Sequence, residues 1–164
     1  MLDKNLKTNK MKDNFTVKDE CSFSLYPEIK EKVILDAFIG ECITYDLPDE
    51  VGDVLVEAWN SRFWTSKGYD GATVIKNKKH PSIANFFHDY FYRCGFASSY
   101  KGGIMVDRIY KEMLQLTGYK KYKSNLRYGF IRLFGSYFRI SHRIKGNASK
   151  PSVNLIDLYT RLKN

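Results

Sequence analysis

The sequence predicts an α+β protein that is mainly helical, with a short N-terminal strand or hairpin region followed by an antiparallel helix bundle. Two patterns predict this fold class. From Lys32 to Tyr45, β-branched and aromatic residues partly alternate with other residues and the run stops before Pro48, which is typical of a strand or a short hairpin. After Pro81, apolar residues recur at spacings of three and four, which is the period of one helix face.

The predicted helices begin and end at recognisable signals. Pro48 and the two acidic residues after it suit the first turn of a helix over residues 49–60. The next helix, which carries an HDxxY motif, begins near Pro81 and ends at Gly95. Three more helices are expected at residues 104–116, 124–140 and 155–162. The apolar side of the helix over 124–140 is predicted to consist of Leu126, Phe130, Leu133, Phe134 and Tyr137.

Length and composition predict one domain with a tail. The chain has 164 residues, 43% of them hydrophobic, which is enough for one buried core and too few for two large domains. Residues 1–20 are polar and are expected to form a flexible or partner-binding arm. Residues 21–150 are the expected globular domain, and residues 151–164 the expected short C-terminal helix.

The sequence shows no pattern of a membrane span or of a disulfide framework. No apolar run reaches the roughly 18 residues that a spanning helix needs, and the first ten residues are charged and polar. The three cysteines are far apart and form no CxxC pair. We therefore expect a protein made in a reducing cytosol.

The positive charge is concentrated in one stretch. Residues 113–150 contain nine Lys and Arg and no Asp or Glu, whereas the whole chain has a net charge of +9. Such a surface would attract nucleic acid, an anionic lipid surface or an acidic protein, or it would be a solvated helix face paired with the acidic half of the same domain. The candidate binding residues are Lys120, Lys121, Lys123, Arg127, Arg132, Arg139 and Arg143.

A polar motif is set in the aromatic helix after Pro81. His88 and Tyr92 are four residues apart and share a helix face, Asp89 is adjacent, and Asp107 belongs to the following helix. An imidazole with nearby carboxylates can activate water or bind a cation. The same residues can also form a buried polar clamp between helices, with Asp107 ion-paired to an arginine such as Arg93 or Arg108.

Four motifs in order resemble a small family of uncharacterised phage and prophage proteins. They are the DGAT turn at residues 70–73, His88-Asp89 with Tyr92, Asp107 after an aliphatic residue, and small residues in the next helix, including Gly135. The resemblance covers residues 63–137. It implies a phage-related origin and no established activity.

A second, weaker resemblance is to phospholipases A2, in which a helix bearing HDxxY packs against a helix bearing an acidic residue. The resemblance implies that His88 activates water, that Asp107 orients His88, and that Tyr92 joins their hydrogen-bond network. It also implies that Asp89 holds a cation, Ca²⁺ or Zn²⁺. The glycine-rich calcium loop of those enzymes is missing here, and Asp70 is the only evident upstream donor.

Two functions are consistent with these patterns. The first is a structural component of a tailed bacteriophage particle, in the tail, the neck or the capsid-associated assembly, without cofactor and without enzyme activity. Its expected partners are other virion proteins in a symmetric assembly close to packaged DNA. The alternative is a metal-dependent hydrolase, directed at phospholipid or peptidoglycan, that acts when a phage enters or lyses its host, with His88, Asp89 and Asp107 as catalytic residues and Asp70 and Asp89 as metal ligands.

Overall fold

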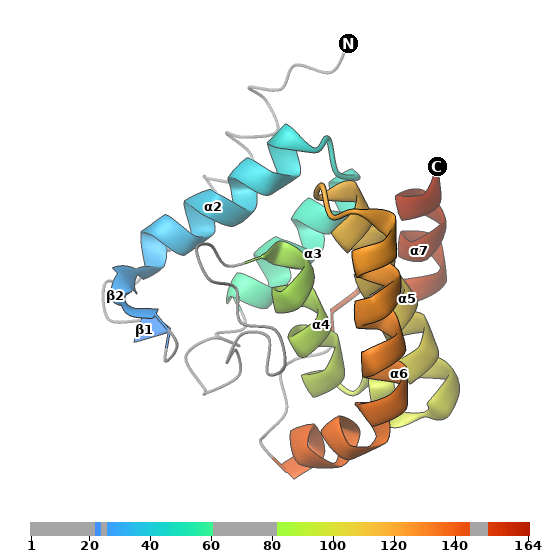
Figure 1. Ribbon diagram of the computed structural model, residues 1–164. Coiled ribbons are helices and arrows are strands. Elements are labelled where there is room, and N and C mark those ends of the chain that lie inside the picture. The colour runs from blue at the N-terminus through green and yellow to red at the C-terminus, as the bar shows by residue number, and fades with distance from the viewer. Residues whose placement is uncertain (1–21, 24–25, 61–81, 145–150) are drawn as a thin grey trace.

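The protein is a helical bundle (Figure 1). The computed structural model describes residues 22–23, 26–60, 82–144 and 151–164, and all structural statements below concern those residues. Two short strands, β1 (Ser22–Phe23) and β2 (Tyr26–Lys30), pair as a small antiparallel ribbon ahead of the first labelled helix. The helices are α2 (Glu31–Thr44), α3 (Asp49–Asn60), α4 (Ile83–Arg93), α5 (Tyr100–Leu116), α6 (Lys121–Ile144) and α7 (Leu155–Lys163), with the 3-10 turn η1 (Phe96–Ser98) between α4 and α5.

The predicted α+β class is wrong, because the residues assigned to a strand or hairpin form a helix. The run from Lys32 to Tyr45 lies almost entirely within α2. Its buried side chains, Leu35, Phe38, Ile39 and Cys42, follow spacings of three and four, so they form one helix face. The apolar residues of α2 are not concentrated on one side of the helix, so the sequence of the run shows no clear helical period. The burial of Phe38 and its contact with Phe86 decided for the helix.

The helices predicted elsewhere in the described residues are confirmed. The predicted helix over 49–60 is α3, and its buried residues include the predicted face of Val51, Val54, Leu55 and Ala58. The helices predicted at 104–116, 124–140 and 155–162 are α5, α6 and α7, each longer than expected by one to several residues at one or both ends. The α5 extension begins at Ser99, whose side chain accepts a hydrogen bond from the Gly102 N–H.

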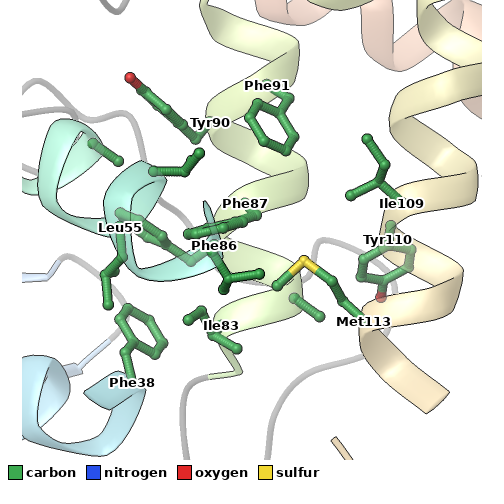
Figure 2. Close-up of a cluster of buried hydrophobic side chains, with 14 of the residues drawn as sticks. Phe38, Leu55, Ile83, Phe86, Phe87, Tyr90, Phe91, Ile109, Tyr110 and Met113 are labelled. Atoms are coloured by element: carbon green, nitrogen blue, oxygen red, sulfur yellow. The ribbon is translucent and has the colours of Figure 1, made fainter. Parts of the chain in front are cut away.

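The core lies where α2, α3, α4 and α5 meet (Figure 2). Phe38 of α2 and Phe86 of α4 have ring centroids 5.1 Å apart. Figure 2 shows Ile109, Tyr110 and Met113 of α5 directed toward the aromatic side of α4. Burial of these large side chains is the main term that holds the four helices together.

Helix α5 is the central element of the second half of the chain. It contacts α4, α6 and α7, and α6 lies along its outer side (Figure 1). Paired residues run in opposite directions along both α4/α5 and α5/α6, so the three helices are antiparallel, as predicted. The turns that reverse the chain use Gly95 and Gly118, both with positive φ (86° and 88°), a backbone conformation that glycine adopts without steric cost.

The packing of α6 differs from the prediction. Leu126, Phe130, Leu133 and Phe134, predicted to face the core, are all exposed, and Leu133 retains 77% of its accessible surface. The opposite face of α6, which contains the small buried residues Ser124 and Gly135, lies against the bundle instead. None of the described helices is both long enough and apolar enough to cross a membrane.

Candidate functional site

The polar residues of the HDxxY motif meet at one buried carboxylate. Asp107 on α5 has no exposed side-chain surface. Its Oδ1 atom lies 3.0 Å from His88 Nε2 and accepts a hydrogen bond from the Tyr92 hydroxyl at 2.8 Å. Its Oδ2 atom accepts a hydrogen bond from a terminal guanidinium nitrogen of Arg132 at 2.7 Å. We call His88, Tyr92, Asp107 and Arg132 the Asp107 cluster; it joins α4, α5 and α6.

Local sequence and helix packing both build this cluster. His88 and Tyr92 are one helical turn apart on α4, so their side chains reach the same point on α5. Arg132 comes from α6, whose buried Gly135 faces α4, so that a Cβ added there would be in ordinary contact, at 3.5 Å, with the Tyr92 hydroxyl. A small residue at this position therefore allows α6 to approach the motif.

The charge of Asp107 is stabilised within the protein. Burial by itself would raise the pKa of Asp107, but hydrogen bonds from His88, Arg132 and Tyr92 hold the pKa below its ordinary value. Asp107 is therefore an ionised group inside the bundle, compensated by Arg132, whose side chain is 19% exposed. A buried carboxylate with this many donors is a strong constraint on how three helices pack.

The imidazole of His88 contacts two tyrosine rings in addition to its Nε2 contact with Asp107. Its ring centroid lies 4.5 Å from that of Tyr92 and 4.8 Å from that of Tyr110. Tyr110 in turn donates a hydrogen bond to Asn85 Oδ1 at 2.8 Å, and burial raises the pKa of Tyr110 to about 12. When Nε2–H donates to Asp107, Nδ1 is the acceptor nitrogen of the neutral ring.

The structure brings together some of the predicted site residues. His88, Tyr92 and Asp107 meet as the motif predicted, and Asp89 is buried beside them on α4. Asp70 lies outside the described residues, so a metal site made of Asp70 and Asp89 stays a prediction. Within the described part of the chain, no group of three or more His, Cys, Asp or Glu is placed to hold a metal ion.

Arg132 is the member of the cluster that the sequence reasoning misplaced. It was assigned to the basic binding surface, and the ion-pair partners considered for Asp107 were Arg93 and Arg108. Arg132 instead forms the ion pair with Asp107 at 2.7 Å. Its separation from Asp107 by 25 residues gives no local signal, and only the antiparallel packing of α5 and α6 brings the two together.

The other predicted binding residues whose side chains are described lie at or near the N-terminal end of α6. Lys120, Lys121 and Lys123 are exposed, and no ion pair between them and another described residue is present. Arg127 lies over the ring of Tyr119, 4.5 Å from its centroid. Arg139 and Arg143 belong to α6, but their side chains lie outside the described part of the structure.

An exposed apolar row, which the sequence reasoning missed, lies beside these lysines. We call it the α6 outer row: its residues are Tyr122, Leu126, Phe130, Leu133 and Phe134, between 42% and 77% exposed. The rings of Phe130 and Phe134 stack with centroids 6.3 Å apart. The spacing of the row was visible in the sequence, but nothing local showed that it faces solvent instead of the core.

In comparisons with protein-family models, curated proteins and solved structures, none matched this chain.

Proposed function

We propose that the protein is a structural component of a tailed bacteriophage particle and that it docks on a neighbouring virion protein through the α6 outer row. The observation that carries this proposal is the exposure of five large apolar side chains in one row on a helix without acidic residues. Apolar patches of this kind on a folded protein typically mark interaction surfaces. The phage setting rests on the motif resemblance at residues 63–137, and the role of the N-terminal arm concerns residues outside the described part of the structure.

The Asp107 cluster supports this proposal by giving the motif a structural role. One carboxylate fixes α4, α5 and α6 through three donors, so it holds α6 in the orientation that exposes the outer row. A docking helix on a rigid base loses less entropy on binding than a loose one. The HDxxY motif would therefore contribute to docking indirectly, by fixing the position of α6.

The test places a photo-crosslinking amino acid at position 133, the most exposed residue of the row. The full-length chain is expressed in the cell that encodes it, phage production is induced, and purified particles are irradiated and analysed by mass spectrometry. We expect the chain to be present in the particles and crosslinked at position 133 to a virion protein. The same amino acid at position 156, exposed on α7, is the matched control. Absence of the chain from purified particles would refute the proposal.

A second candidate function is hydrolysis, favoured by one specific observation. The 3.0 Å contact of His88 Nε2 with Asp107 is the arrangement in which a carboxylate orients an imidazole and leaves Nδ1 to accept a proton from water. The described residues contain one carboxylate next to His88 besides Asp107, which is fewer oxygen ligands than a Ca²⁺ site requires. We therefore assign no step to a metal.

The two functions predict different effects of His88→Gln on hydrolytic activity and on stability. Hydrolysis predicts loss of esterase, phospholipase or peptidoglycan-cleaving activity in a variant that remains folded, measured on the full chain with and without added Ca²⁺ or Zn²⁺. Docking predicts that the wild-type protein shows no such activity and that His88→Gln changes stability only. The matched control is Tyr92→Phe, which removes one hydrogen bond from Asp107 and leaves the imidazole in place.

A further inference from the structure

We infer that the partner segment that covers the α6 outer row is an amphipathic helix with acidic flanks, carried by another protein. This inference rests on the proposed docking function and names the chemistry of the partner. It starts from the geometry of the row. Its residues are spaced by three and four positions over about 18 Å of helix, which is the seam along which two helices pack.

The charges beside the row require a partner with negative charge. Lys120, Lys121 and Lys123 are exposed at one end of the row, without an ion pair to any described residue. Helix α6 contains six Lys and Arg and no Asp or Glu, and the charge of Arg132 is neutralised by Asp107. A helix that packs on the row and has glutamate or aspartate at its flanks would satisfy both the apolar surface and the unpaired lysines.

A second copy of this chain does not fit the same surface. Symmetric pairing of two α6 helices would place two basic helices, each without an acidic residue, side by side. The acidic helix of the described chain, α3, does not fit either. Asp49 and Asp53 are exposed, but its apolar residues Val51, Val54 and Leu55 are already buried in the core. Neither arrangement offers an apolar face together with negative charge.

An anionic bilayer fits less well than an acidic helix. With about 100° of rotation per residue, Lys123 projects between Phe130 and Phe134 when α6 is viewed along its axis. If the row inserted into a bilayer, the Lys123 ammonium group would lie among the inserted apolar side chains. A partner helix can instead place a carboxylate opposite it. The five residues of the row span about 120° of the circumference, which is the width of the apolar stripe by which a surface helix packs on its neighbours.

The test uses two synthetic amphipathic peptides of 18 residues, each with leucine at seam positions. One has glutamate at the flanks and the other has lysine at the same positions. Binding to the full-length chain is measured by fluorescence anisotropy. We expect the glutamate peptide to bind and the lysine peptide to bind at least about tenfold more weakly. We also expect Lys121→Gln with Lys123→Gln to reduce the salt dependence of glutamate-peptide binding.

Two variants locate the binding on the row. Leu126 and Leu133 are 61% and 77% exposed, so Leu126→Gln with Leu133→Gln is expected to leave the fold intact, as checked by circular dichroism. This double variant should weaken binding of the glutamate peptide at least about tenfold. Ile156→Gln on α7 replaces a similarly exposed apolar residue, 62%, away from the row and should leave binding unchanged.

Four results would overturn the inference. The first two are equal binding of the two peptides and no binding of the glutamate peptide. The third is binding to vesicles of phosphatidylcholine and phosphatidylglycerol that depends on the row and is as strong as peptide binding. The fourth is a dimer in light scattering that the double leucine variant abolishes. The first two exclude an acidic helix, the third indicates a membrane and the fourth a second copy. Each is distinct from failure of the docking function, because a crosslink from position 133 to a virion protein would stand even if the peptide result were negative.

Discussion

Asp107→Asn is expected to destabilise the protein by about 2.5–5 kcal/mol, because a single carboxylate joins three helices. The bond between Arg132 and Oδ2, 2.7 Å long, is charge-assisted and contributes about 1.5–3 kcal/mol. An amide nitrogen at that position cannot accept it. The bonds from His88 and Tyr92 change from charge-assisted to neutral, and each loses roughly 0.5–1 kcal/mol. Since Asp107 has no exposed surface, water does not replace these partners.

Urea unfolding followed by circular dichroism measures this loss. In thermal unfolding, the melting temperature of a chain of this length should fall by roughly 10 °C. Asp53→Asn is the matched control, because Asp53 is exposed on α3 and the same substitution should change the free energy of unfolding by less than about 0.5 kcal/mol. A folded Asp107→Asn variant within about 1 kcal/mol of the wild type would refute the clamp.

The pH dependence provides an independent check of the same residue. The pKa of Asp107 in the folded state lies below its ordinary value of 3.8, so the unfolded state binds the proton more tightly. The resulting stability is present above pH 3.8 and is lost as the pH falls through the folded-state pKa. The difference in the free energy of unfolding between the wild type and Asp107→Asn should therefore become smaller as the pH falls below 3.8. A difference in the free energy of unfolding that stays constant from pH 7 down to the pH at which the protein unfolds in acid would contradict this account.

Three further predictions concern the bundle. Burial raises the pKa of Glu41 to about 7, although the Ile83 N–H that donates to it at 2.9 Å lowers this pKa. The stability that Glu41 contributes is therefore fully present below pH 4.5 and is lost as the pH rises through 7. Urea unfolding at pH 5 to 8 should show a loss on the order of 2 kcal/mol in the wild type and a flatter profile in Glu41→Gln. Gly102→Ala should destabilise by roughly 1–3 kcal/mol in thermal melts, because the added Cβ would overlap the carbonyl oxygen of Phe96; an unchanged melting temperature would show that the turn adapts freely. Leu158→Ala on α7 should cost about 2–4 kcal/mol in urea unfolding, because Leu158 is fully buried; a loss below about 1 kcal/mol would mean that α7 is not part of the core.

The helical half of the fold was accessible from the sequence because its signals are local. The apolar spacings in α3, α4 and α5, together with the stop at Gly95, do not depend on distant contacts. The error at α2 has a different cause: its apolar residues are spread around the helix, so the sequence shows no clear helical period, and the buried face of Leu35, Phe38, Ile39 and Cys42 is defined by what packs against it.

The sequence by itself determined that α4 presents His88 and Tyr92 on one face, that Asp107 lies on the next helix, and that α6 is a basic helix with an apolar stripe. Only the tertiary structure decided which arginine reaches Asp107 and which side of α6 faces the solvent. Both follow from the way α6 packs on α5, with small residues inward and the larger stripe outward. A periodic pattern shows that a helix has an apolar face, but whether that face lies in the core or on a docking surface depends on what the rest of the chain places against it.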